Sequence, residues 1–158
     1  MINPKKLYQI LEKNGISNYI GVADSVLKNF LELIPSKKNL VSTNEGSAVS
    51  YGIGYHLSTK KIPLVYLQNS GLGNAINPLI SIASKKVYSI PLALLIGWRG
   101  STNSKDEPQH IAQGKITRDL LNLLGIRYLI LNKDRDLNKI NKLLNFSKYN
   151  NIPIALLV

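Results

Sequence analysis

The chain has 158 residues, of which 44% are hydrophobic and 18% charged, a composition typical of one folded domain that excludes a mainly disordered protein. It has no cysteine and only two histidines, His56 and His110, so disulfide scaffolds, thiolate zinc sites and multi-histidine metal cages are excluded. The net charge is +11, but sixteen of the twenty basic residues are lysines scattered along the chain. We interpret them as a solvated surface and expect no nucleic-acid partner.

No stretch reaches the ~18 consecutive apolar residues of a membrane-spanning helix. The first ten residues, MINPKKLYQI, lack the apolar core of a secretory signal. We therefore expect a cytoplasmic protein without a membrane partner.

The predicted elements alternate between helix and strand along the whole chain. Proline and glycine mark several of the boundaries, and short apolar runs mark the strands. The first half of the chain is predicted to contain a helix from Pro4 that ends at Gly15, a strand over 19–22, a helix capped by Asp24 that ends at Pro35, a strand over 39–42, a helix over 45–58 and a strand over 63–67. The helix capped by Asp24 is expected to bury Val26, Leu27, Phe30, Leu31 and Ile34. The second half is predicted to contain a helix over 71–83, a strand over 91–96, a polar loop over 97–113, a helix over 116–124, a strand over 128–131, a helix over 137–150 and a strand over 153–158.

This alternation predicts an α/β fold, a three-layer arrangement in which a parallel sheet carries helices on both faces. Ligands of such sheets bind beyond the carboxyl ends of the strands. Four polar or glycine-bearing segments follow predicted strands: 23–25, 44–46, 68–71 and 97–113. We expect the functional site where these segments meet.

Glu45 stands at the start of a glycine-bearing helix, directly after a strand. One interpretation is an acid that complements the helix dipole, worth ~0.3–1 kcal/mol. The other is a carboxylate held at a ligand site, where it accepts a hydrogen bond or a proton. Position alone leaves both open.

The segment QNSGLGN, residues 68–74, also follows a strand and opens a helix. Such a loop offers backbone N–H groups to a polar ligand, or it is only a tight turn. It contains G-x-G without the full dinucleotide motif, and no lysine of a phosphate-binding loop.

The polar segment 97–113 contains one arginine between glycines, in Gly97-Trp98-Arg99-Gly100. An arginine there suits two-pronged capture of a phosphonate, phosphate or carboxylate. A loop of this length is either functional or disordered. His110 fits a proton carrier or a plain loop residue, whereas His56, within a helix, fits a packing or surface residue.

Five segments together resemble the phosphonopyruvate decarboxylases, which are thiamine-diphosphate enzymes. The resemblance runs through nearly the whole chain and keeps the family's order and spacing. One departure is Ala23, where the family usually has proline. The segments are GVADS (21–25), TNEGSAVSYGIGYHL (43–57), LVYLQNSGLGNAINPL (64–79), YSIPLALLIGWRG (88–100) and KDEPQHIAQGKIT (105–117).

The resemblance implies the pyrimidine-binding domain of the thiamine-diphosphate fold over residues 1–158, with roles for nine residues. It implies that Glu45 is catalytic and hydrogen-bonds the pyrimidine ring nitrogen of the cofactor. Gln68, Asn69 and Gly71 would line the pyrimidine pocket. The candidates for the substrate end are Asp24, Ser25, Arg99, Gln109 and His110, and no metal ligand is expected in this chain.

The implied reaction converts 3-phosphonopyruvate, a small 2-oxo acid, to phosphonoacetaldehyde and CO₂ in phosphonate biosynthesis. The sequence has no Gly-Asp-Gly motif, so we expect a partner domain or subunit to bind the diphosphate through magnesium, in a hetero- or homo-oligomer. In the related sulfopyruvate decarboxylases the two halves are separate subunits. A sulfopyruvate decarboxylase alpha subunit, or a binding module that kept the fold and lost catalysis, are the alternatives.

Overall fold

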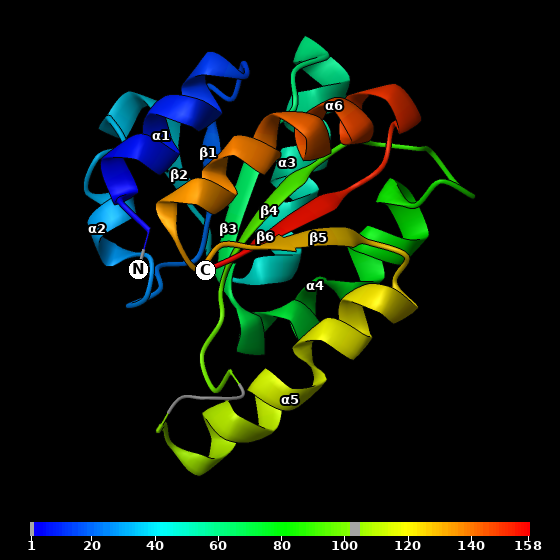
Figure 1. Cartoon of the computed structure of the whole chain (residues 1–158). Helices are drawn as coiled ribbons and strands as arrows, with labels where there is room; N and C mark the ends of the chain where they lie inside the picture. The colour runs from blue at the N-terminus through cyan, green and yellow to red at the C-terminus, as the bar shows by residue number, and fades with distance from the viewer. Residues whose placement is uncertain (1, 102–104) are drawn as a thin grey trace.

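The computed structural model describes residues 2–101 and 105–158. Its six strands are all parallel and form one sheet in the order β2-β1-β3-β4-β6-β5 (Figure 1). The strands are β1 (Tyr19–Gly21), β2 (Asn39–Val41), β3 (Leu64–Gln68), β4 (Ala93–Gly97), β5 (Arg127–Ile130) and β6 (Ile154–Leu157). The helices are α1 (Pro4–Lys13), α2 (Lys28–Leu31), α3 (Glu45–Thr59), α4 (Leu72–Pro78), α5 (Pro108–Leu123) and α6 (Ile140–Asn150).

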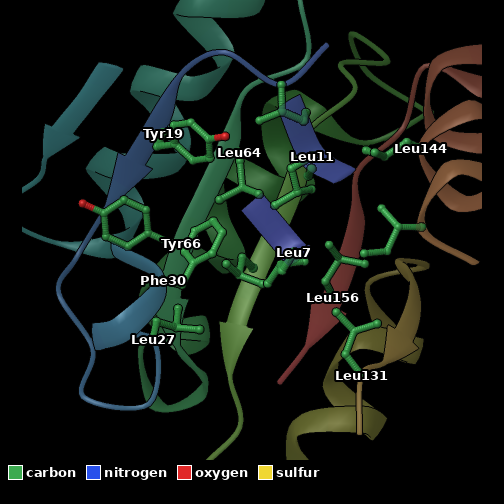
Figure 2. Packing of buried hydrophobic residues seen from close by; sticks show 14 of the residues in the cluster. Leu7, Leu11, Tyr19, Leu27, Phe30, Leu64, Tyr66, Leu131, Leu144 and Leu156 are labelled. Atoms are coloured by element: carbon green, nitrogen blue, oxygen red, sulfur yellow. The ribbon is translucent and has the colours of Figure 1, made fainter. Parts of the chain in front are cut away.

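The sheet is covered on both faces, which confirms the predicted three layers. Alternate residues of β3 point to opposite sides: Leu64 and Tyr66 join the cluster formed with α1, α2 and α6 (Figure 2), and Val65 and Leu67 join the cluster formed with α3, α4 and α5. A strand buried on both faces is a continuous apolar run, which is why β3 and β4 were recognisable in the sequence.

The strand order fixes where a site is expected. The chain passes from β1 outward to β2 and then returns to place β3 on the other side of β1. The carboxyl end between β1 and β3 is therefore a topological switch point, where loops leave in opposite directions and open a space for a ligand. β3 and β4 end level with each other, since Gln68 pairs with Gly97.

Two helices begin where their capping residues predict. The Asn3 side chain accepts the Lys6 N–H at 3.1 Å before α1, and Asn44 accepts the Ser47 N–H at 2.9 Å before α3. Each cap satisfies a backbone donor that the first turn leaves without a partner. The cap at Asn44 also sets Glu45 as the first residue of α3.

The prediction of a long helix capped by Asp24 is wrong. α2 has only four residues, and Val26, expected inside, is 42% exposed. Leu27, Phe30 and Ile34, also expected inside, are buried as predicted. The Asp24 side chain is instead buried, 6% exposed, and packs against Gly97 of β4. The carboxylate therefore makes a tertiary contact, while the amides of Val26 and Leu27 remain close to it.

The polar loop predicted over 97–113 is shorter than expected. α5 begins at Pro108, so Gln109 and His110 lie in its first turn. Proline is favoured at this position because its missing N–H would have no partner there and its φ is already helical. Residues 102–104 of the predicted loop lie outside the described residues.

Other boundaries differ less. The helix predicted over 71–83 is α4 followed by a π-helical turn, Leu79–Ala83, and the helix predicted over 137–150 is a 3₁₀ segment, Asp134–Lys139, followed by α6. Among the described residues, the helices are too short or too polar to cross a lipid bilayer.

The burial of the central strands predicts how much a core substitution lowers the free energy of unfolding. Leu95 of β4 is fully buried, whereas Leu123 at the end of α5 is 83% exposed. We expect Leu95→Ala to lower the free energy of unfolding by about 2–5 kcal/mol and Leu123→Ala to change it by less than about 0.5 kcal/mol, as measured by urea denaturation. Equal losses would contradict the placement of β4 at the centre of the sheet.

Candidate cofactor and substrate site

The residues selected from the sequence gather at one edge of the sheet. Asp24 and Ser25 follow β1, and Glu45 follows β2 at the start of α3. Gln68 ends β3, and Arg99 follows β4. Parallel strands place all four carboxyl ends on the same edge, so side chains far apart in sequence meet there.

The Glu45 carboxylate rests directly on Gly71. A Cβ atom at residue 71 would overlap Oε1, Cδ and Cγ of Glu45, so only glycine leaves room for the side chain in this position. Oε2 accepts a hydrogen bond from Nδ2 of Asn74 at 2.9 Å. Oε1 makes no hydrogen bond to a described residue, and the side chain is partly exposed. The carboxylate is thus oriented by the protein, with one oxygen left for a ligand.

The close packing of α3 on α4 fixes this arrangement. A Cβ at Gly46 would overlap the backbone carbonyl of Asn74, so the first turn of α3 lies against α4. The helix that carries Glu45 and the helix that carries its partner Asn74 are therefore held at a set distance.

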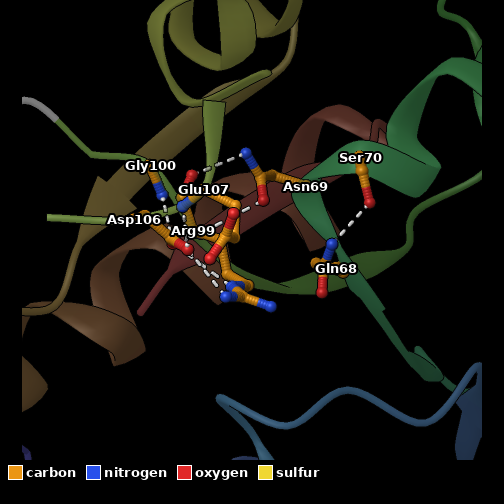
Figure 3. A network of polar contacts seen from close by, with 7 residues as sticks. All are labelled: Gln68, Asn69, Ser70, Arg99, Gly100, Asp106 and Glu107. Atoms are coloured by element: carbon orange, nitrogen blue, oxygen red, sulfur yellow. Dashed lines mark hydrogen bonds and ion pairs between the residues drawn. The ribbon is translucent and has the colours of Figure 1, made fainter. Parts of the chain in front are cut away.

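Asn69 joins the ends of β3 and β4. Its Oδ1 accepts the Arg99 N–H at 3.1 Å, and its Nδ2 donates to the Arg99 carbonyl at 3.0 Å (Figure 3). Nδ2 also donates to Oγ1 of Thr117 at 3.0 Å. Asn69 and Thr117 are each 2% exposed. All the usual hydrogen-bonding groups of this amide are engaged by protein, and its role in the pyrimidine pocket stays a prediction.

The other predicted residues of this edge are less constrained. Gln68 donates from Nε2 to Oγ of Ser70 at 2.6 Å, within its own loop, and is partly exposed. Ser25 is exposed. Their ligand roles stay predictions.

The Arg99 guanidinium is engaged side-on by Asp106. Nε and Nη2 donate to the two carboxylate oxygens at 3.2 and 2.7 Å. This pairing raises the pKa of Arg99 and holds the pKa of Asp106 at about 2. The arginine expected to clamp an acidic ligand group therefore has a carboxylate partner already.

Asp24 is the buried acid of the site. Its carboxylate packs on the Cα of Gly97, where a Cβ would overlap Oδ2, and neither oxygen makes a hydrogen bond to a described residue. Burial raises the pKa of Asp24; the nearby amides of Val26 and Leu27 and the charge of Arg99 oppose the shift without cancelling it. A carboxyl of this kind keeps its proton to a higher pH than an exposed one.

The first turns of α5 lie against the loop that carries Arg99. A Cβ at Gly100 would overlap the His110 carbonyl, and one at Gly114 would overlap the Gly100 carbonyl. Nε1 of Trp98 donates to the Gly114 carbonyl at 3.0 Å. This contact brings His110, partly exposed, and Gln109, exposed, to the same edge of the sheet.

Three polar residues of the site were not selected from the sequence: Asn74, Asp106 and Thr117. Asn74 ends the QNSGLGN segment, and Asp106 lies in KDEPQH. Motif membership could have indicated these two. Thr117 ends the longer segment KDEPQHIAQGKIT (105–117), but its role depends on Asn69, 48 residues away.

The profile of the family described as "Thiamine pyrophosphate enzyme, N-terminal TPP binding domain" matches residues 5–123, most of the chain. The chain belongs to this family of thiamine-diphosphate (TPP) binding domains, as its motifs had suggested.

The named relatives differ in how much of their length this chain covers. Phosphonopyruvate decarboxylase of Streptomyces viridochromogenes is 34% identical over 134 residues, which cover 83% of this chain and 33% of that protein. Sulfopyruvate decarboxylase subunit alpha of Methanocaldococcus jannaschii is 33% identical over 123 residues, 76% of this chain and 70% of that one. The chain thus spans about a third of the first relative.

Solved structures agree on the fold. Thiamine-diphosphate-dependent 4-hydroxybenzoylformate decarboxylase of Rhodococcus jostii superposes with a TM-score of 0.70 at 22% identity, over 98% of this chain and 29% of that one. A benzoylformate decarboxylase from Polynucleobacter necessarius gives a TM-score of 0.68 at 20% identity, over 98% of this chain and 29% of that one.

The residues at the carboxyl edge fit the aminopyrimidine of thiamine diphosphate. Oε1 of Glu45 is an acceptor without a described protein partner, and it lies where Gly71 leaves no side chain in the way. A protonated ring nitrogen needs an acceptor of this kind. Glu45 and Gly71 would hold this part of the cofactor.

The contact between Gly71 and Glu45 is testable without a ligand. We expect Gly71→Ala to lower the free energy of unfolding by about 1–3 kcal/mol through overlap with Glu45. Gly73→Ala, the control two residues later in α4, should raise it by about 0.5–1 kcal/mol, because nothing lies within 4 Å of its Cβ and alanine favours the helix. In a Glu45→Ala background the Gly71→Ala loss should largely vanish. An unchanged loss in that background would contradict the contact.

Burial of Asp24 predicts a pH dependence of stability. The pKa of Asp24 is raised, so its contribution is complete below the unfolded-chain pKa and is lost as pH rises through the folded-state pKa. Relative to wild type, Asp24→Asn should therefore gain stability as the pH rises from the unfolded-chain pKa of about 4 through the raised folded-state pKa, measured by urea denaturation. Asp119→Asn, at an exposed position on α5, is the control. A wild-type-to-Asn difference that stays constant with pH would contradict a buried, titrating Asp24.

Proposed function

We propose that this chain is the pyrimidine-binding half of a thiamine-diphosphate-dependent decarboxylase that acts on 3-phosphonopyruvate and releases phosphonoacetaldehyde and CO₂. The observation that carries the proposal is the Glu45 carboxylate, held by Asn74 and laid on Gly71 with Oε1 available to a ligand. A glutamate that served only the helix dipole would not need a glycine opposite it.

In this proposal Glu45 is the catalytic acid-base group of the chain. Oε1 accepts the ring N–H of the aminopyrimidine and holds that proton, while the bond from Asn74 keeps Oε2 in place. When bound, thiamine diphosphate supplies the electron sink that takes up the charge left by loss of CO₂. Gly71 and Gln68 shape the pocket, and Asn69 fixes its wall through Arg99 and Thr117.

The substrate end would be formed by residues of β1, β4 and α5. Arg99 binds the acidic group of the substrate. Asp24, buried with a raised pKa, remains protonated over a wider pH range and donates a hydrogen bond to the reacting carboxylate or carbonyl. Ser25, Gln109 and His110 lie nearby at the same edge and complete the set.

A partner domain or subunit would bind the diphosphate through magnesium. Two observations support such a partner. The relatives from methanogens are named as alpha subunits, and the edge strand β2 exposes Leu40 and Val41 at 46% and 66%. Apolar side chains on an uncovered strand edge invite pairing with another chain.

Sulfopyruvate is the second candidate substrate, favoured by relatives of that name at 30–33% identity. Sulfonate and phosphonate are both tetrahedral oxyanions, so the same arginine suits either. The GWRG and KDEPQH segments favour phosphonopyruvate.

The test is CO₂ release from both substrates, with thiamine diphosphate and magnesium, by the chain alone and by the chain co-purified with a Gly-Asp-Gly-bearing partner. We expect turnover only with the partner, because the chain alone lacks that motif. Turnover by the chain alone would overturn the division of the site. Stable complexes with several such partners and no turnover would support a binding module instead.

In the active complex, Glu45→Gln should keep the fold, because the two side chains have the same size, and lower kcat by roughly 100-fold or more with a smaller effect on KM. The matched control is Glu32→Gln, at an exposed position just after α2. A normal kcat for Glu45→Gln would return Glu45 to the helix-dipole interpretation.

A further inference from the structure

Asp106 is the acceptor at the centre of the loop that carries Arg99. Its carboxylate accepts four hydrogen bonds: Oδ2 from Arg99 Nε at 3.2 Å and from the Gly100 N–H at 3.2 Å, and Oδ1 from Arg99 Nη2 at 2.7 Å and from the Glu107 N–H at 2.9 Å (Figure 3). The Asp106 side chain is 12% exposed, against 29% for Arg99. The carboxylate is thus the more enclosed member of the pair.

Arg99 is fixed at both ends. Asn69 holds its backbone N–H and carbonyl, and Asp106 holds the Nε–Nη2 edge of its side chain. A guanidinium has a second edge, formed by its two terminal nitrogens, which matches a pair of oxyanion oxygens. Nη1 makes no hydrogen bond to a described residue, so no described residue occupies this second edge.

Immobilising a long side chain before binding removes an entropy cost that binding would otherwise carry. The pair of Arg99 and Asp106 has no net charge. Binding of an oxyanion by this pair therefore depends on the direction in which the second edge of Arg99 points. Attraction by excess positive charge would call for an arginine without a carboxylate partner.

We propose that Asp106 is a positioning residue that presents the second edge of Arg99 to the tetrahedral oxyanion of the substrate. The inference rests on the proposed function, since it assumes a substrate with a phosphonate or sulfonate group. Asp106 stays bonded to Arg99 while the ligand binds.

A positioning role and a purely competitive role of Asp106 predict opposite changes in oxyanion affinity when Asp106 is replaced by asparagine. If Asp106 only occupies Arg99 until a ligand displaces it, Asp106→Asn removes a competitor and a repelling charge, and oxyanions bind more tightly. If Asp106 positions Arg99, the same substitution leaves the guanidinium free to turn, and oxyanions bind more weakly.

The first experiment uses methylphosphonate as the probe and the full 158-residue chain. The Nε–H signals of the four arginines are followed by ¹H–¹⁵N spectroscopy. Arg118 is the internal control, since its Nε donates to the Tyr128 hydroxyl at 3.1 Å. We expect methylphosphonate to shift the Arg99 signal, and Asp106→Asn to weaken the apparent affinity by roughly 10-fold. Asp106→Glu should recover part of this loss, and Asp119→Asn should leave the affinity unchanged.

Arg99→Lys keeps the folded pairing possible and removes the second edge. The backbone N–H signals of residues 99 and 100, followed in the same spectra, should respond to methylphosphonate in wild type and not in Arg99→Lys, even if Asp106→Asn does not fold. Equal or tighter binding by Asp106→Asn, or a wild-type chain whose Arg99 signal does not respond, would overturn the inference.

The second experiment separates this inference from the proposed function. In the active complex, Asp106→Asn should lower kcat/KM for 3-phosphonopyruvate roughly 10-fold more than for pyruvate, which has no acid group for Arg99. If wild type decarboxylates neither, the proposed function fails. If wild type is active and the variant lowers both equally, the proposed function stands and the positioning role of Asp106 is overturned.

Discussion

Burial of the sheet on both faces is the constraint from which the rest of the molecule follows. The central strands β3 and β4 are buried almost throughout, so their side chains are apolar and supply no chemistry. Polar groups are confined to the strand ends, and parallel pairing brings four of those ends to one edge. At this edge two carboxylates pack against glycine. Glu45 lies on Gly71 and Asp24 lies on Gly97, so each carboxylate contacts backbone where another residue would have a side chain. Each of these carboxylates occupies the space that the Cβ of any residue other than glycine would fill.

The sequence analysis predicted the fold wherever a local signal was sufficient. Apolar runs identified β3 and β4, and the helices predicted from Pro4 and from residue 45 begin at those residues as α1 and α3. It failed for α2, because the Asp24 side chain looks like a cap in sequence but lies against Gly97, 73 positions away. The start of α5 was missed although Pro108 indicated it, because the polar residues around it resembled a loop.

For the site, the family resemblance selected Glu45 and Gly71, and the structure adds the contact that joins them. It selected Asn69 as a pocket residue, whereas all the usual hydrogen-bonding groups of that amide are used to join the ends of β3 and β4. Such a role depends on partners 30 and 48 positions away, which no local pattern encodes. Asp106 was passed over although its partners Arg99 and Gly100 are only seven and six positions away, because its importance comes from its geometry around Arg99.

The two clusters on either side of the sheet differ in what they support. The helices of one, α3, α4 and α5, carry Glu45, Asn74 and Thr117, so a shift of any of them moves a residue of the site. The helices of the other, α1, α2 and α6, carry none of these residues and only need to cover the sheet. Over evolutionary time the two faces should therefore drift at different speeds. In the first cluster, lineages should retain side-chain shape as well as hydrophobicity, whereas in the second they are free to exchange one apolar residue for another.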